Sequence, residues 1–192
     1  MTVALTLTIA QEFLEGNFAP WILDLKPKLI DCSNGFARID IPITPHIERV
    51  GHIVCGQAMG ALADTTMVFA CFAHMDKLVP VATTTLDTQF LRPASGDILS
   101  CRAKVERAGK ALFFLSAELV TMPSEKVVAK STATFYLPSG GLMAAFAKRF
   151  ETPVIIWQRG QKACQKHDRY HPPRQHGPAG QQHVHNIHRG FH

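Results

Sequence analysis

One acidic side chain, Asp64, stands in the middle of a long apolar run. The run GHIVCGQAMGALADTTMVFACFAH covers residues 51–74 and contains no Lys, Arg or Glu to pair with it. A carboxylate in an apolar helix is costly unless it accepts hydrogen bonds or takes part in a reaction. Partial burial also raises the pKa of a carboxyl group toward values that suit proton transfer. Asp64 is therefore a candidate nucleophile or general base; the alternative is an acid held by Thr65, Thr66 or nearby backbone.

The residues that open the same helix form a second candidate group. Gly56 lies eight residues before Asp64. A helix N-terminus presents unpaired N–H groups and the positive end of a dipole, which suit a developing oxyanion. Two helical turns separate Gly56 from Asp64 by about 12 Å along the axis, too far for both to serve one carbonyl directly. The same position favours a thiolate, so Cys55 is a candidate nucleophile, against the alternative of a small buried Cys.

The elements that must position these residues follow from the apolar pattern. Residues 8–16 indicate a short helix, with Thr8 and Gln11 in a capping-box pattern. Asn34-Gly35 is a strong two-residue hairpin signal and predicts strands on both sides. The long apolar helix is expected over residues 55–74, after a loop.

The second half of the domain changes to strand periodicity, in which apolar and polar residues alternate. Because each later strand follows the last through a short turn, we expect antiparallel neighbours. An antiparallel sheet of about six strands, curled around one apolar helix, is an α+β arrangement. The later strands are predicted over residues 79–91, 99–109, 111–122 and 126–137.

The net charge is concentrated beyond residue 151. The formal charge is +5, yet residues 1–151 carry 14 Lys and Arg against 14 Asp and Glu, and seven of the ten His lie further on. A balanced body argues against nucleic acid or an anionic membrane as a partner. We expect a domain over residues 1–142 and a basic, His-rich tail over 143–192, which cannot bury enough surface to order itself.

The cysteines and the first residues bear on location. Five widely spaced Cys without a CxxC pair indicate free thiols in a reducing compartment. The first residues have no basic segment typical of a secretory signal, so the cytoplasm is expected. The His-rich tail fits no closed metal site. Residues 53–73 are long enough to cross a bilayer, but a central Asp would cost about 2.5–3.5 kcal/mol there, which favours a helix buried in a soluble domain.

The frame CGQAMGALAD resembles the hotdog-fold acyl-CoA thioesterases of the phenylacetate-degradation type, in a likeness spread over about residues 10–138. Members of that family typically carry His-Gly-Gly, four residues, Leu, one residue and Asp. Gly56 and Asp64 keep this frame, while Cys55 and Gln57 replace the His and the second Gly. The Asn often found six residues before the family's His falls on Arg49.

The resemblance implies hydrolysis of acyl-CoA thioesters to free acid and CoA, without a metal or redox cofactor. It implies that Asp64 is the nucleophile or general base and that the Gly56 N–H polarises the thioester carbonyl. Ten positions before Pro93, Thr83 is implied to hold the attacking water. It further implies a homodimer or dimer of dimers, in which the Asp of one subunit faces the Gly of the other.

Other residues are candidates for catalysis or substrate binding. Gln57 could donate to the carbonyl in place of the missing family group, or could face a dimer partner. Basic residues at strand ends could meet the phosphates of coenzyme A, with plain solvation as the alternative. Aromatic and Met residues could line an acyl pocket or belong to the core. The substrate-binding candidates are Arg49, His52, Cys55, Thr84, Arg92, Arg107 and Lys110, and the pocket-or-core set is Met59, Met67, Phe69, Phe72 and Phe90.

Two rival functions are open at this level. A hotdog dehydratase would pair a loop His, here His52, with Asp64 for proton removal beside the thioester. A non-catalytic acyl-CoA binding protein would account for the altered His-Gly-Gly. The first predicts enoyl-CoA hydration, and the second predicts acyl-CoA affinity without thiol release.

Overall fold

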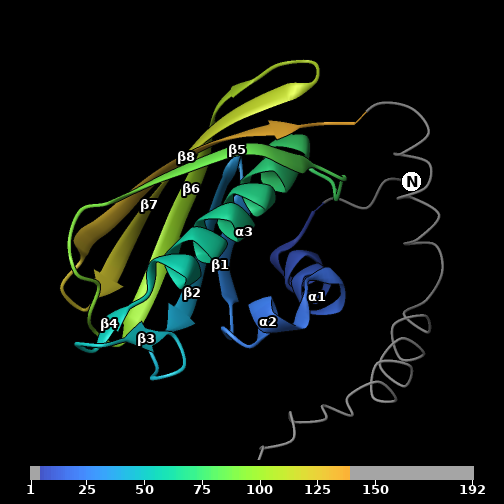
Figure 1. The fold of residues 1–192 in the computed structure, drawn as a ribbon. Coiled ribbons are helices and arrows are strands. Elements are labelled where there is room, and N and C mark those ends of the chain that lie inside the picture. The colour runs from blue at the N-terminus through green and yellow to red at the C-terminus, as the bar shows by residue number, and fades with distance from the viewer. Residues whose placement is uncertain (1–4, 139–192) are drawn as a thin grey trace, which may run out of the picture. The chain divides into compact units, whose positions relative to one another are not determined.

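The computed structural model describes residues 5–138, and the structural statements below concern that part of the chain. The expected domain end at 142 and the expected tail at 143–192 lie outside the described residues. The described part contains three helices, a six-stranded antiparallel sheet and a small two-stranded hairpin (Figure 1). The predicted α+β class and the hotdog arrangement are confirmed.

The N-terminal helices are α1 (Leu7–Asn17) and α2 (Pro20–Leu23). The side chain of Thr6 caps α1 by accepting a hydrogen bond from the Ile9 N–H at 3.2 Å. The prediction that Thr8 is the cap was wrong, because the backbone is already helical at Leu7. The sequence reading missed α2, a single turn whose Pro occupies the first helical position, where no N–H is needed.

The predicted hairpin is formed by β1 (Lys28–Ser33) and β2 (Phe36–Pro42). Its two turn residues both have positive φ, 50° at Asn34 and 74° at Gly35, as a type I′ turn requires. The following segment was expected to be a loop. It contains instead the short hairpin β3 (Glu48–Arg49) and β4 (Ile53–Val54), which leads into the long helix.

The long helix is α3 (Gly56–Met75), one residue displaced from the predicted range. It is long and apolar enough to cross a membrane by length and composition, but 67% of that apolar window is buried inside the domain. Figure 1 shows α3 lying against one face of the sheet, with α1 and α2 beside it. The helix is apolar on most of its surface because the sheet and α1 enclose it.

The remaining strands are β5 (Ala82–Phe90), β6 (Ile98–Ala108), β7 (Leu112–Met122) and β8 (Lys126–Tyr136). The order in the sheet is β1-β2-β6-β7-β8-β5. The expectation that β5 and β6 are neighbours was therefore wrong. Since β2 already occupies the free edge of β6, β5 pairs with β8 at the far edge of the sheet.

The core lies between α3 and the inner face of the sheet. As the alternation predicts, one side of β6 and of β7 is buried, for example Leu99 and Cys101 on β6 and Phe113 and Leu119 on β7. The edge strand β5 is different, because it is exposed along most of its length. Its inward side therefore remains open toward α3, and this opening is where the candidate site lies.

Candidate functional site

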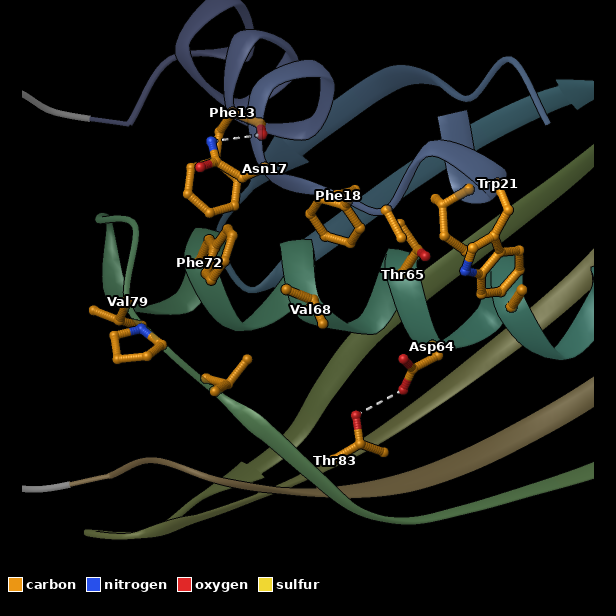
Figure 2. Close-up of a pocket in the computed structure, with 15 residues that line it drawn as sticks. Phe13, Asn17, Phe18, Trp21, Asp64, Thr65, Val68, Phe72, Val79 and Thr83 are labelled. Atoms are coloured by element: carbon orange, nitrogen blue, oxygen red, sulfur yellow. Dashed lines mark hydrogen bonds between the residues drawn. The ribbon is translucent and has the colours of Figure 1, made fainter. Parts of the chain in front are cut away.

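Asp64 meets Thr83 at the opening between α3 and β5. The Thr83 hydroxyl donates a hydrogen bond of 2.8 Å to Oδ1 of Asp64 (Figure 2). The carboxyl group is half-buried and Thr83 is exposed. The alternative that Thr65 or Thr66 holds the acid is not what the structure shows: Thr66 donates instead to the Leu62 carbonyl oxygen at 2.7 Å. Among the described residues the carboxylate thus has one side-chain donor, on Oδ1, and its second oxygen, Oδ2, accepts no hydrogen bond.

A bulge in β5 aims Thr83 at the acid. The pairing of β5 with β8 shifts by one residue between Thr83 and Thr85, leaving Thr84 as the inserted residue. Thr83 is opposite the fully buried Phe135, so it faces inward, while the strand beyond the bulge resumes its alternation with Leu86 inward. The Thr84 hydroxyl is occupied by a 2.8 Å hydrogen bond to the Thr134 carbonyl oxygen. Bulges commonly re-aim a side chain in this way.

Two opposing effects act on the Asp64 carboxyl group. Burial raises its pKa above the ordinary value because the charged form loses solvation, and the hydrogen bond from Thr83 partly offsets that rise. The larger of the two is burial, so the net direction is upward. A carboxylate with a raised pKa is a stronger base than a solvated one, which suits removal of a proton from water.

Gly56 is the first residue of α3, and Cys55 is its N-cap without a side-chain capping bond. The cap therefore leaves N–H groups of the first turn without a side-chain acceptor. A Cβ added to Gly56 would come within 3.1 Å of Cζ of Phe90, whose ring lies over the helix start. A glycine here thus allows close approach of the β5 aromatic ring to the helix.

The Gly56 end of α3 borders its own cavity, of about 440 Å³. Two of its lining residues are cations, Arg49 from β3 and Arg92 from the end of β5. One nitrogen of the Arg92 guanidinium donates to the Val127 carbonyl oxygen at 2.7 Å, and both Arg92 and Arg49 are exposed. This cavity combines helix N–H groups with positive charge.

The other predicted residues near the helix start lie at the surface. Gln57 is exposed in the first turn of α3, and Cys55 is half-buried. His52 is 94% exposed at its side chain, with Nδ1 3.3 Å from Oε2 of Glu48. It therefore interacts within its own hairpin and not with Asp64. Arg107 and Lys110 lie at the β6–β7 turn, and neither lines the cavity beside Asp64 or the one beside Gly56.

A second cavity, of about 430 Å³, borders Asp64 and Thr83. The pocket-or-core set divides between the two cavities and the core. Phe72 lines the Asp64 cavity, Met59 and Phe90 line the Gly56 cavity, and Met67 and Phe69 are fully buried core residues. The sequence reading missed the aromatic residues from α1 and α2 that line the Asp64 cavity. The only signal for them is their density in a short segment: Phe13, Phe18 and Trp21.

The sequence around Gly56, Asp64 and Thr83 matches the model of a known protein family. Residues 51–128, from the β3–β4 turn into β8, match the family model described as the thioesterase superfamily. Within residues 51–128 the chain therefore resembles the thioesterase superfamily, and the described domain has the hotdog fold. The match includes Gly56, Asp64 and Thr83, which the structure places on the two elements that border the site.

Solved structures share the fold of the described domain. The PaaI protein from the phenylacetic acid degradation operon of E. coli is 24% identical, with a TM-score of 0.61 over 68% of this chain and 91% of that one. A putative thioesterase from Ralstonia eutropha, described as phenylacetic acid degradation-related, is 27% identical, with a TM-score of 0.56 over 66% and 98%. A thioesterase from Haemophilus influenzae is 15% identical, with a TM-score of 0.64 over 71% and 93%. A search of curated proteins finds no match.

Among residues 5–138, no three His, Cys, Asp or Glu side chains come together in a way that could hold a metal ion. What the described geometry offers is a carboxylate with one hydroxyl donor and an apolar cavity, and separately a helix N-terminus with two arginines.

Proposed function

We propose that the domain hydrolyses acyl-CoA thioesters to the free acid and CoA. The observation that carries the proposal is the 2.8 Å hydrogen bond from Thr83 to Asp64 at the mouth of an apolar cavity. The match of residues 51–128 to the thioesterase superfamily model supports it. So do the neighbours named as thioesterases, at the level of the general activity.

In the proposed reaction Asp64 acts as a general base. Its free oxygen removes a proton from water, and the water oxygen bonds to the thioester carbon, while the carbonyl oxygen becomes an oxyanion held by the Gly56 N–H. Collapse of the tetrahedral intermediate breaks the C–S bond, and the CoA thiolate takes the proton from Asp64. Direct attack by Asp64 as a nucleophile is the alternative. It forms a mixed anhydride, and it would place an oxygen of H₂¹⁸O in the aspartate during a single turnover when water attacks the aspartyl carbon of that anhydride. The proposed reaction needs no metal or redox cofactor.

The reacting carbonyl cannot reach both groups within one protomer. Gly56 and Asp64 are about 12 Å apart along α3 and border different cavities. We therefore propose a homodimer, alone or within a dimer of dimers, in which Asp64 of one subunit faces Gly56 of the other. The inward side of β5 supports this, because Leu86 and Phe90 are exposed next to α3, where a second copy could cover them.

The Asp64→Asn variant tests the activity. Asn keeps the size and the acceptor for Thr83 but cannot take a proton, so thiol release from acyl-CoA should fall by about 10³-fold or more. Circular dichroism and thermal unfolding of the same sample check that the fold is retained. Turnover equal to that of the unmodified protein would refute the proposed role of Asp64.

Mixed dimers test the shared site. Asp64→Asn and Gly56→Pro each disable one half, so a heterodimer of the two contains one intact site and one doubly altered site. Co-expression with two different tags should recover up to half of the native specific activity in the doubly purified heterodimer. A heterodimer as inactive as its parents would refute a site shared between subunits. Asp64 and Gly56 would then act within the same protomer or not act on the same substrate at all.

The two rivals predict different outcomes of the same assays. A binding protein would retain acyl-CoA affinity with no thiol release by the unmodified protein. A hydratase would hydrate enoyl-CoA through His52 and Asp64, and the exposure of His52 beside Glu48 weighs against that pairing.

The cytoplasmic location remains part of the proposal, and the free thiols Cys32, Cys55, Cys71 and Cys101 suit it.

A further inference from the structure

The cavity beside Asp64 continues away from the carboxylate along α3. Asp64, Val68 and Phe72 are spaced by four residues and form one side of the cavity (Figure 2). The opposite side comes from the N-terminal segment and from the approach to β5. Its residues there are Phe13, Phe18, Trp21, Ile22, Val79 and Val81.

The lining of this cavity selects against charge. Asp64 is the only ionisable side chain among the described lining residues, and no Lys or Arg is present to hold an anion. The amide of Asn17 already donates to the Phe13 carbonyl oxygen at 3.0 Å. A second carboxylate on a substrate would therefore lose its solvation and be repelled by Asp64. An uncharged hydrocarbon group would instead gain about 0.8 kcal/mol per buried methylene.

The cavity has one open and one closed end. Trp21, near Asp64, is 58% exposed, whereas Phe72 and Val79 are each 2% exposed and belong to the core. Phe72 is held by edge-to-face contact with Phe13, at a centroid distance of 5.3 Å. The closed end therefore limits the length of an occupant.

The distance along α3 sets that limit. From Asp64 to Phe72 the helix rises about 12 Å. A hydrocarbon chain advances about 1.3 Å per bond, because its bonds of about 1.5 Å zigzag. The cavity thus accommodates up to about nine bonds beyond a carbonyl placed at Asp64. Val68 lies halfway, about 6 Å from each end, so its side chain decides whether a chain can pass.

We propose that this cavity binds the acyl group of the substrate, that it favours uncharged acyl chains of about six to ten carbons, and that Val68 sets their length. The proposal rests on the proposed thioesterase function and names its substrate class. It places the acyl chain within the protomer that supplies Asp64 and Thr83. The carbonyl then lies at the opening, where the other half of the site can reach it.

The first experiment compares chain lengths in two variants. Thiol release is measured for acyl-CoAs from two to sixteen carbons and for glutaryl-CoA, with the unmodified protein, Val68→Phe and the control Val105→Phe. Val105 is a half-buried valine on β6 that does not line the cavity, so the control adds the same bulk elsewhere. Thermal unfolding of each variant checks that the fold is retained.

The unmodified protein should prefer octanoyl-CoA over acetyl-CoA and glutaryl-CoA by at least about tenfold in kcat/KM, as burial of several methylenes requires. Val68→Phe should lower kcat/KM for octanoyl-CoA by at least about tenfold and leave the acetyl-CoA value within about twofold. Val105→Phe should preserve the whole profile. Equal losses for both chain lengths in Val68→Phe, or a preference for glutaryl-CoA, would overturn the proposal.

A second experiment measures binding without turnover. Trp21 lies at the cavity rim, and the other tryptophan of the chain, Trp157, is replaced by Phe. In the Asp64→Asn background, octanoyl-CoA should change Trp21 fluorescence in a saturable way, whereas CoA alone should not. Adding Val68→Phe should weaken the apparent affinity by at least about tenfold.

The two experiments separate the failure of the pocket from the failure of the activity. Saturable Trp21 binding with no thiol release by the unmodified protein would refute the thioesterase and keep the acyl pocket. Thiol release with a chain-length profile that Val68→Phe does not change would refute the pocket and keep the thioesterase.

Discussion

The two halves of the candidate site are built in different ways. The Asp64 half consists of side chains fixed within one protomer, through the hydrogen bond to Thr83 and the cavity behind it. The Gly56 half consists of backbone N–H groups, with Gln57 and Arg49 exposed around them. A backbone donor tolerates changes in neighbouring side chains, since its N–H is present in every residue except Pro. This explains why Cys55 and Gln57, which replace the His and the second Gly of the His-Gly-Gly pattern, both lie in the Gly56 half. The Asp64 half contains the residues that the family pattern expects.

After replacement of Asp64, removal of the Gly56 N–H should cause the largest loss of activity, and it tests the Gly56 half of the site. Gly56→Pro removes the donor at the first helical position, where Pro is tolerated, and Cys55 already has φ −69° and ψ 149°, which suit a residue before Pro. We expect kcat to fall by about 100-fold relative to Gly56→Ala.

Gly56→Ala is the matched control, because it keeps the N–H and still adds a Cβ 3.1 Å from the Phe90 ring. Phe90 is 53% exposed and can turn aside, so the cost of Ala alone should be small. Equal activity in the Pro and Ala variants would show that this N–H does not hold the oxyanion. The proposed division of the site into an acid half and a backbone-donor half would then be refuted.

Loss of the Thr83 hydroxyl should have a smaller effect, with a signature in pH. Thr83→Val removes a hydrogen bond that lowers the pKa of Asp64, so the pKa should rise further. A general base works ionised, and the acid limb of the kcat/KM profile should therefore move to higher pH. At neutral pH we expect about a tenfold loss, the lower end of the range for a hydrogen bond to a charged group, because Thr83 is exposed.

Thr83→Ser keeps the hydroxyl and should restore both the rate and the position of the acid limb. A profile in Thr83→Val that is lower at every pH but not displaced would contradict the direct action of Thr83 on the carboxyl group. It would instead indicate a role in the shape of the opening.

The smallest effect is expected at the cations of the Gly56 cavity. Arg49→Gln should raise KM for acyl-CoA by about three- to fivefold, since exposed charge pairs contribute at most about 1 kcal/mol. The effect should shrink as salt increases. Arg102→Gln is the control, because Arg102 lies outside this cavity, with its guanidinium 3.5 Å from Glu125. A salt-independent change, or an equal change in the control, would remove Arg49 from substrate binding.

Much of the fold could be predicted because it depends on local signals. The Asn34-Gly35 turn, the length of α3 and the alternation on β6 and β7 each follow from a few neighbouring residues. In the site, the same reasoning led to Asp64 through its isolation in an apolar run. The partner Thr83 came from the family resemblance, since 19 positions separate it from the acid.

The remaining features depend on contacts distant in sequence. Strand β5 pairs with β8 because β2 already pairs with the edge of β6. The residues near position 90 contain no local pattern that predicts this pairing. The cavity along α3 needs α1 and α2 to pack against it, although Phe13 and Trp21 look like ordinary apolar residues in the sequence. The periodicity of a run of threonines likewise does not reveal which one faces the acid.

The three consecutive threonines make the hydroxyl beside the acid tolerant of changes in the length of the strand. Because Thr84 is an inserted residue in β5, its deletion would leave Thr83 opposite Phe135 and Thr85 opposite Thr134, so Thr83 would still face inward. Deletion of Thr83 itself would bring Thr84 into the same place. A single-codon deletion in this run therefore keeps a threonine beside Asp64, and loss of that hydroxyl during evolution needs an exchange of the residue.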